Sequence, residues 1–386
     1  MNIPRKLRAM VVDDTILYRK VVSDVLSTIP DVEVVGTASS GKIAISRLPV
    51  LKPDFITLDI EMPELNGIEV LKYLQKNMPE VGAVMLSTLT QEGSDMTIKA
   101  LELGAFDFIA KPQTGTLQEN TKFVHDALAP MVRAFKRQLE IKSILGRKPG
   151  TERSFPTAPA TALKSQPQAT GKTPASIMDR MSRIVKPHAG IPSSELVAIG
   201  ISTGGPNALG RMMPMLPADI GVPILIVQHM PPLFTQSLAK SLDAKCAIKV
   251  KEAAEGDILT PGTAYIAPGG KQMRIAAAPD GRNRMIKITD DPPENSCRPS
   301  ADYLFRSVAE HYIARSTGVI MTGMGSDGTA GLRSMKQNGS VIIAQNEASC
   351  TVYGMPKEPI ESGIADIVAP LDEIAGEILK TLKRNK

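Results

Sequence analysis

The sequence of 386 residues has few cysteines, few aromatic side chains and no long apolar run. Its three cysteines are scattered and odd in number, so they form neither a disulfide framework nor a paired-cysteine metal site, which favours a reducing compartment. No apolar run approaches the roughly 18 residues that a membrane-spanning helix needs, and the N-terminus reaches two aspartates after a few apolar residues. These absences predict a cytoplasmic protein without direct membrane insertion.

The net charge of +5 is concentrated in one segment. Residues 144–190 contain eight Lys or Arg and two acids, so the rest of the chain is close to neutral. Within this segment, 21 of the 29 residues from 147 to 175 are Pro, Ala, Thr, Gly, Ser or Gln, a composition that buries too little apolar surface to fold. We therefore expect a flexible basic linker between two domains. With 4% aromatic residues and no helix-turn-helix pattern, the charge does not favour a nucleic-acid-binding protein.

Short β-branched runs alternate with amphipathic stretches on both sides of the linker. This alternation predicts an α/β fold with two doubly wound parallel-sheet domains, the first flavodoxin-like and the second larger and Rossmann-like. The predicted strands are residues 9–12, 32–36, 55–58, 83–86 and 106–110 in the first domain and 196–199, 223–227, 263–267, 318–322 and 341–344 in the second.

Polar residues follow the strands of the first domain, where open α/β sheets bind ligands. Asp13 and Asp14 follow the first strand, Asp59 ends the third, Ser87 the fourth, and Lys111 follows the fifth. Converging carboxylates favour a hard divalent cation such as Mg²⁺, which would help one carboxylate to accept a phosphoryl group bound by the serine and the lysine. Taken singly, the first two aspartates also fit helix caps, the serine a turn and the lysine a solvated charge.

The segments VVDD, LDIEMPELNG, VMLSTLT and FIAKP together resemble the receiver domain of two-component response regulators over residues 7–125. The resemblance implies that Asp59 is phosphorylated and that Asp14, Asp59 and the backbone carbonyl of Glu61 bind Mg²⁺, with Asp13 assisting. It also implies a switch role for Ser87, Phe108 and Lys111. A buried core phenylalanine accounts for Phe108 equally well.

A Gly-x-Ser-x-Gly segment in the second domain places Ser202 between an apolar strand and a helix that Pro206 can begin. The same context suits a phosphate-binding glycine loop, so the presence of a base decides between the two. Of the four histidines, only His229 directly follows a strand beside that serine, which makes it the candidate general base. Asp327, in a glycine-rich loop after another strand, is the candidate for orienting the imidazole.

The chain order serine, histidine, aspartate differs from that of α/β-hydrolases. The segments AIGISTGGP, IVQHMPP, AYIAPGG, DDPPENSCRPSADYLF, GVIMTGMGSDGTAG and AQNEASCTVYGMP instead resemble the CheB family of chemotaxis methylesterases. The resemblance implies a serine hydrolase that removes methyl groups from γ-glutamyl esters of chemoreceptors and that in some relatives deamidates glutamines. Backbone N–H groups near Thr203 and Met324 are the candidates for the oxyanion hole.

The resemblance also implies how the two domains work together. The expected division is a receiver at 7–125, a helix extension and linker at 126–190, and a methylesterase domain at 191–386. Phosphorylation by the histidine kinase CheA would release the esterase, which itself needs no cofactor. Two alternatives remain at this point: a regulated esterase for a different ester outside chemotaxis, and an inactive interaction module.

Overall fold

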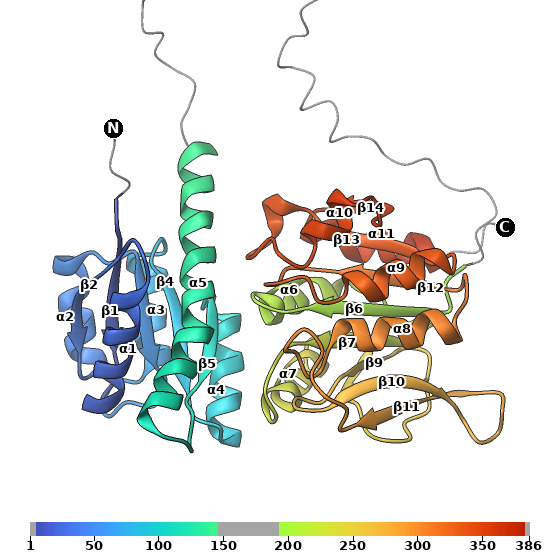
Figure 1. Cartoon of the computed structure of the whole chain (residues 1–386), viewed down its shortest axis with the longest axis horizontal. Coiled ribbons are helices and arrows are strands. Elements are labelled where there is room, and N and C mark those ends of the chain that lie inside the picture. The colour runs from blue at the N-terminus through green and yellow to red at the C-terminus, as the bar shows by residue number, and fades with distance from the viewer. Residues whose placement is uncertain (1–4, 146–192, 383–386) are drawn as a thin grey trace, which may run out of the picture.

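The computed structural model describes residues 5–145 and 193–382, which form two α/β units (Figure 1). The first unit has a five-stranded parallel sheet in the order β2-β1-β3-β4-β5. Its central strands are buried along their length because helices cover both faces, as expected for parallel sheets. The strands are β1 (Leu7–Val12), β2 (Val32–Ala38), β3 (Phe55–Asp59), β4 (Gly82–Ser87) and β5 (Asp107–Ala110).

Several helices of this unit begin directly after a residue whose side chain accepts a hydrogen bond from a backbone N–H of the first helical turn. The third helix, for example, begins with a capping box in which Asn66 and Glu69 each bond the other's backbone N–H. The last helix is the longest of this unit, with 29 residues, and it extends past the end of the sheet (Figure 1). The helices are α1 (Ile16–Thr28), α2 (Gly41–Leu51), α3 (Gly67–Asn77), α4 (Gln91–Glu102) and α5 (Leu117–Leu145).

The second unit has a seven-stranded parallel sheet in the order β14-β13-β12-β6-β7-β9-β8. The five predicted strands are confirmed, while β8, β14 and an antiparallel hairpin of β10 and β11 were not predicted. The strands are β6 (Leu196–Ile201), β7 (Ile224–Gln228), β8 (Lys249–Glu252), β9 (Thr263–Ile266), β10 (Gln272–Ala277), β11 (Arg284–Thr289), β12 (Ser316–Ile320), β13 (Val341–Gln345) and β14 (Ile367–Ala369).

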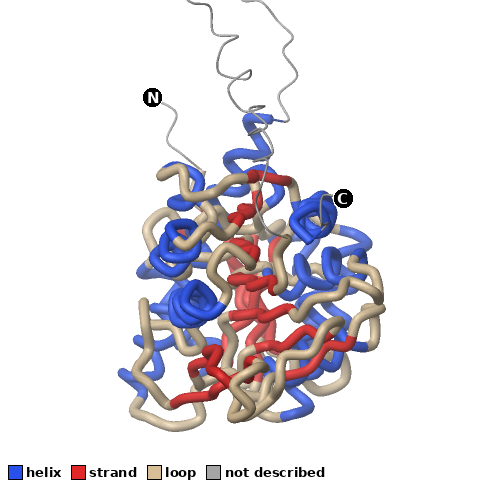
Figure 2. The backbone as a smooth tube through the Cα atoms, turned by 90° about the vertical axis from the view of Figure 1, so that its right-hand side faces the viewer, coloured by secondary structure: helices blue, strands red, loops and turns tan. Residues whose placement is uncertain are grey.

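Helices flank this sheet on both sides, with the strands between them (Figure 2). Strand β6 lies between β7 and β12, and the chain builds the sheet outwards from it in both directions. This is a topological switch point, where the loops after neighbouring strands separate and leave room for a ligand. The helices are α6 (Gly205–Met212), α7 (Phe234–Asp243), α8 (Ala301–His311), α9 (Thr329–Gln337), α10 (Lys357–Glu361) and α11 (Leu371–Leu382), with 3-10 turns η2 (Met213–Met215) and η3 (Glu347–Ser349).

Within residues 5–145 and 193–382, no helix is both long and apolar enough to cross a membrane. The predicted flexible linker lies outside the described residues, apart from the part of its helical extension that belongs to α5.

Candidate functional site

The acidic residues predicted at the first sheet lie together at the ends of β1 and β3. Carboxylate oxygens of Asp13, Asp14 and Asp59 lie within 4.8 Å of one another. Lys111 Nζ lies 2.8 Å from Asp13 Oδ2 and 2.7 Å from Asp59 Oδ2. Burial raises the pKa of Asp59 to about 6 although the nearby lysine charge lowers it, so the carboxylate is held in an unfavourable environment.

This cluster fits a divalent cation. Asp59 Oδ1 is buried and has no hydrogen-bond partner among the described residues, so an oxygen ligand remains to be satisfied. Asp14 is exposed at the rim of the cluster and opens it to solvent. Carboxylate oxygens together with water are the ligands that Mg²⁺ prefers, and the donor set therefore suits that ion.

The other predicted receiver residues have different surroundings. Ser87 Oγ is buried and is bonded towards α4, to Gly93 O at 3.1 Å and to Thr97 Oγ1 at 2.7 Å. The ring of Phe108 is buried and stacks on Phe234 of the second unit, with 4.5 Å between ring centroids. In this conformation the serine hydroxyl therefore bonds away from the aspartates, and the phenylalanine belongs to the contact between the two units.

Ser202 stands at the end of β6 in a tight turn. Its N–H donates to Thr322 O at 3.0 Å, and its carbonyl accepts from Gly205 N at 2.7 Å. Gly204 has a φ of 77°, a conformation that favours glycine. A Cβ on Gly323 would lie 2.8 Å from Ser202 Cβ, so a glycine there lets the loop after β12 approach the serine closely. The serine is partly exposed.

His229 and Asp327 meet beside this serine. The backbone N–H of His229 donates to Ile201 O at 3.2 Å, which places the histidine next to the serine turn. His229 Nε2 lies 2.8 Å from Asp327 Oδ2. The described residues contain no hydrogen bond between Ser202 Oγ and the imidazole. The structure thus joins the histidine to the aspartate and places the serine next to them along the sheet edge.

The environment of Asp327 keeps it ionised. Its side chain is 2% exposed and accepts hydrogen bonds from Ala301 N at 2.6 Å, Ser300 Oγ at 2.8 Å and Asp302 N at 3.2 Å. Burial by itself would raise its pKa, but the bond to His229 and these donors lower the pKa to about 2. The donors include the first N–H groups of α8, where the helix dipole favours a negative charge.

The imidazole is held in one orientation with a defined proton. Since the ionised Asp327 can only accept, Nε2 of His229 carries the proton of the neutral imidazole, and Nδ1 is the nitrogen that takes a second proton. Burial lowers the pKa of His229, whereas the hydrogen bonds to Asp327 and to Cys297 raise it to about 9. Cys297 Sγ lies 3.7 Å from Nδ1. A base with its acceptor nitrogen aimed away from the aspartate suits proton transfer to and from a nearby hydroxyl.

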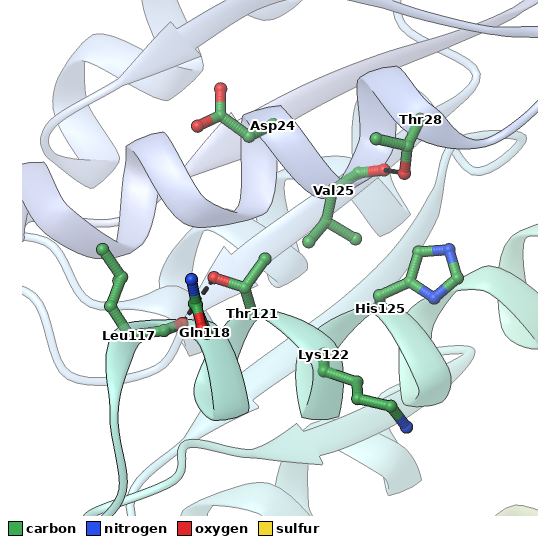
Figure 3. Close-up of a pocket in the computed structure, with 8 residues that line it drawn as sticks. All are labelled: Asp24, Val25, Thr28, Leu117, Gln118, Thr121, Lys122 and His125. Carbon is green, nitrogen blue, oxygen red and sulfur yellow. Dashed lines mark hydrogen bonds between the residues drawn. The ribbon is translucent and has the colours of Figure 1, made fainter.

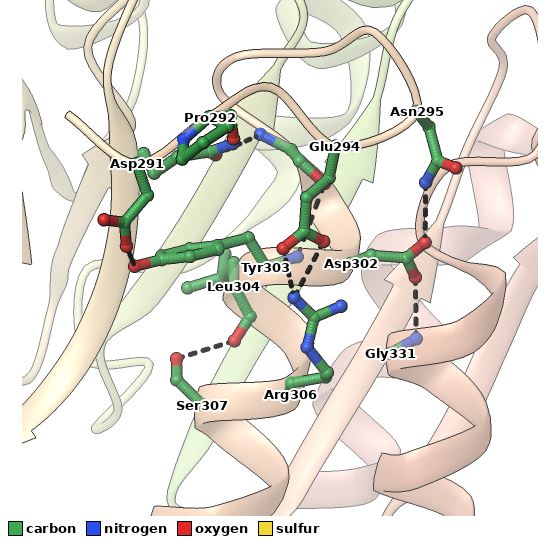
Figure 4. A network of polar contacts seen from close by, with 12 residues as sticks. Asp291, Pro292, Glu294, Asn295, Asp302, Tyr303, Leu304, Arg306, Ser307 and Gly331 are labelled. Carbon is green, nitrogen blue, oxygen red and sulfur yellow. Dashed lines mark hydrogen bonds and ion pairs between the residues drawn. The ribbon is translucent and has the colours of Figure 1, made fainter. Parts of the chain in front are cut away.

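The loop of residues 290–300 supports this geometry (Figure 4). From the sequence alone this loop is identified only as part of a segment that carries the family resemblance, and its residues have no assigned role. Asn295 Nδ2 donates to Asp302 Oδ2 at 2.9 Å and to Asp327 Oδ1 at 3.1 Å. Arg306 binds both carboxylate oxygens of Glu294, at 2.5 and 2.7 Å. Sequence reasoning missed these residues because no periodicity marks the loop, although a serine directly before a helix at 300 signals a cap.

The two oxyanion candidates lie beside the serine. In the described residues the backbone N–H of neither Thr203 nor Met324 donates a hydrogen bond, so both remain available to a ligand. Thr203 is buried, and its side chain lies beside the carboxyl of Asp107, which belongs to β5 of the first unit. Burial raises the pKa of Asp107 to about 6.

The first unit packs against this edge of the second, with α4 and β5 facing α6 and α7 (Figure 1). Ser237 of α7 bonds Asp95 Oδ1 at 2.5 Å, Ser94 Oγ at 2.8 Å and Gln91 Nε2 at 3.0 Å. At the other end of α4, Glu102 pairs with Lys245 at 2.5 Å. The contact therefore borders the loop that carries the candidate nucleophile.

A pocket between α1 and α5 lies away from both sites and contains none of the predicted site residues (Figure 3). His125, which the sequence offers as one of four possible bases, lines this pocket together with Lys122 and Asp24. It is thus separated from the serine, and His229 is the histidine that the fold brings to it.

Known proteins resemble the chain over nearly all of its length. Residues 197–378 match the family described as CheB methylesterase, and residues 9–121 match the response regulator receiver domain. The protein-glutamate methylesterase/protein-glutamine glutaminase of Desulfotalea psychrophila is 55% identical over 380 residues, which is 98% of this chain and 99% of that one. The enzyme of the same name from Trichodesmium erythraeum is 37% identical over 378 residues, with 98% and 99% covered.

Among solved structures, the CheB methylesterase catalytic domain of Thermotoga maritima is 41% identical, with a TM-score of 0.47, and the match covers 49% of this chain and 99% of that one.

Proposed function

The chain belongs to the CheB methylesterase family, in the form that carries an N-terminal response-regulator receiver domain, and from this premise we propose how its residues work. In this proposal the chain hydrolyses γ-glutamyl methyl esters of chemoreceptors and deamidates receptor glutamines; its full-length relatives are named protein-glutamate methylesterase/protein-glutamine glutaminase. The observation that carries the residue assignment is the pairing of His229 with Asp327 beside Ser202. Relatives that match along the whole chain do not favour an esterase outside chemotaxis.

Ser202 is the nucleophile in this proposal. Nδ1 of His229 takes the hydroxyl proton as Oγ attacks the ester carbonyl, and Asp327 stabilises the imidazolium that forms. The imidazolium then gives the proton to the methoxy oxygen, which leaves as methanol, or to the amide nitrogen of a glutamine, which leaves as ammonia. Water that gives its proton to Nδ1 then hydrolyses the acyl-enzyme. The N–H groups of Thr203 and Met324 bind the oxyanion, at about 3 kcal/mol per donor.

Asp59 is the phosphoacceptor of the receiver domain. Asp13, Asp14 and Asp59, with the backbone carbonyl of Glu61, are the residues that would hold Mg²⁺. The ion, when bound, neutralises charge on the phosphoryl group. Lys111 already contacts two of the aspartates and would bind a phosphoryl oxygen, while Ser87 would have to exchange its bonds towards α4 to do the same.

The described conformation supports inhibition of the esterase by the unphosphorylated receiver. Receiver residues contact the segment next to the nucleophile, through Asp107 and Thr203 and through the stacked rings of Phe108 and Phe234. A chemoreceptor helix needs access to Ser202 at this edge of the sheet. Phosphorylation would therefore activate by favouring an arrangement in which these contacts are released.

The proposal includes the division of the chain and its setting. The receiver occupies residues 7–125, a helix extension and basic linker 126–190, and the catalytic domain 191–386. The phosphodonor is the histidine kinase CheA, the substrates are chemoreceptors, and the protein works in the cytoplasm. The esterase reaction itself uses no cofactor.

Methanol release from methylated chemoreceptor membranes tests the proposal. The full-length protein is compared with its Ser202→Ala variant, with and without Mg²⁺ and a small-molecule phosphodonor. We expect release that the phosphodonor stimulates and that disappears in the variant. Equal release by the two proteins would overturn the assignment of the nucleophile, and no release by a phosphorylated protein would overturn the substrate.

A further inference from the structure

A thiol lies next to the proposed base, and the proposed hydrolysis does not use it. Cys297 is partly exposed, and its Sγ lies 3.7 Å from Nδ1 of His229, the nitrogen that accepts the proton of the nucleophile. His229, Cys297 and Asp327 present nitrogen, sulfur and oxygen atoms within 4.8 Å of one another. The described residues contain one other cluster of this kind, which consists of oxygen donors alone.

Backbone and side-chain hydrogen bonds of the loop hold the backbone of Cys297 in place. Glu294 and Cys297 exchange two backbone hydrogen bonds, at 3.1 and 2.7 Å. The Glu294 carboxylate is bound by Arg306, and Gln272 Nε2 donates to Cys297 O at 3.4 Å. The sulfur therefore reaches the imidazole from an anchored backbone.

The geometry fits a thiophilic metal ion. In a tetrahedral zinc site, Zn–S is about 2.3 Å and Zn–N about 2.0–2.1 Å, which separates the two ligand atoms by roughly 3.5 Å. The observed 3.7 Å between Nδ1 and Sγ is close to this value. Asp327 supports the imidazole from its other nitrogen, the usual outer-shell arrangement of a zinc-bound histidine. Its oxygens already accept hydrogen bonds from Ser300 and Ala301, so it orients rather than binds.

We propose that Nδ1 of His229 and Sγ of Cys297 form a binding site for Zn²⁺ or a similar thiophilic transition ion, and that the bound ion inhibits the esterase. Binding forms one bond to nitrogen and one to sulfur and releases to solvent the thiol proton and, where the imidazole is protonated, the proton on Nδ1, with no change of oxidation state. Water occupies the remaining positions on the ion. Inhibition follows because the ion holds the nitrogen that would take the Ser202 proton. This inhibition rests on the proposed function, whereas the binding itself does not.

Cobalt binding tests the site without an activity measurement. The reduced, metal-free full-length protein is titrated with Co²⁺, whose bonds to thiolate give a charge-transfer absorption that oxygen ligands do not give. We expect this absorption at one ion per chain, lost in Cys297→Ser and retained in Cys246→Ser, which alters a partly exposed cysteine elsewhere. Absorption that persists in Cys297→Ser, or that is absent from the unchanged protein, would overturn the proposal even if esterase activity is normal.

Zinc inhibition tests the consequence. Each protein's methanol release is measured with increasing Zn²⁺ at constant Mg²⁺ and expressed relative to its own rate without zinc. Loss of a metal ligand should raise the half-inhibiting zinc concentration of Cys297→Ser at least about tenfold, while Cys246→Ser follows the unchanged protein. A chelator should restore the rate. Equal zinc sensitivity of Cys297→Ser and the unchanged protein would refute inhibition through this pair.

Discussion

Replacing Ser237 by alanine should loosen the docking of the receiver without altering either site. The hydroxyl is buried in the contact, and its bond to Asp95 Oδ1 is 2.5 Å long. Its other receiver contacts, Ser94 and Gln91, also bond each other, at 2.8 Å. Alanine keeps the helix intact, since it is the best helix former. The variant thus removes a docking contact while the partner side chains keep other bonds.

The size of the effect can be estimated from one hydrogen bond, because the Ser237 hydroxyl has a single proton and donates it to the Asp95 carboxylate. A hydrogen bond to a charged group contributes about 1.5–3 kcal/mol. Asp95 is exposed, so solvent weakens the bond and we take the lower end of this range. Because 1.4 kcal/mol is a factor of ten, Ser237→Ala should shift the docking equilibrium roughly tenfold towards release. Basal esterase activity should rise by that factor while the docked form predominates.

The assay is methanol release by the full-length protein in the absence of phosphodonor. Ser334→Ala is the matched control, because this helical serine in α9 is partly exposed and its hydroxyl bonds, among the described residues, only to Ala330 O. A basal rate for Ser237→Ala within about twofold of the control would refute the docking argument. A rise that also appears in the isolated catalytic domain carrying the same substitution would refute it as well, since no receiver is present there.

Three further outcomes are expected. Asp59→Asn should lose phosphodonor stimulation and keep basal methanol release; a folded variant without basal activity would contradict the proposed roles. Because only neutral imidazole accepts a proton and the pKa of His229 is about 9, kcat/KM should increase with pH up to about 9; a profile already level above about pH 7 would contradict this. Burial raises the pKa of Asp107 to about 6, so the docked state binds a proton more readily than the released state and docking strengthens as pH falls through about 6. Without phosphodonor, the rate of the full-length protein divided by that of Asp107→Asn at the same pH, a ratio in which protonation of the base cancels, should fall from about pH 7 to about pH 5; a constant ratio would contradict the argument.

The positions of the candidate sites could be predicted from the sequence because strand ends determine them. Asp59 ends one buried strand and Ser202 directly follows another, and parallel strands bring their carboxyl ends to one edge. His229 could be placed for the same reason. Strands β8 and β14, with four and three residues, are too short for a periodic signal, and the hairpin of β10 and β11 lies outside the βα alternation.

Contacts between distant segments account for what the sequence did not predict. Cys297 reaches His229 because Gln272 and Arg306 anchor its loop, and these partners come from a strand and a helix on either side of it. The contact of Asp107 with Thr203 depends on how two separately folded units dock. No local pattern in either segment specifies its partner, so only the structure identifies these contacts.

In the proposed regulation, phosphorylation and the docking contacts act on the same equilibrium, which constrains how their effects combine. Asp107 begins β5, and Lys111, which lies beside Asp59, directly follows that strand. At about 3.3 Å per residue, Asp107 and Lys111 are therefore about 13 Å apart. A ligand that turns a 1:99 equilibrium into 99:1 must supply about 5.5 kcal/mol of differential binding. Loss of the Ser237 contact supplies only about a quarter of this, so the phosphodonor should still activate Ser237→Ala. Since the fully released enzyme sets a common maximal rate, stimulation of the variant should fall by the same factor by which its basal rate rises. A variant whose basal and maximal rates both rise would show that Ser237 affects the catalytic step rather than docking.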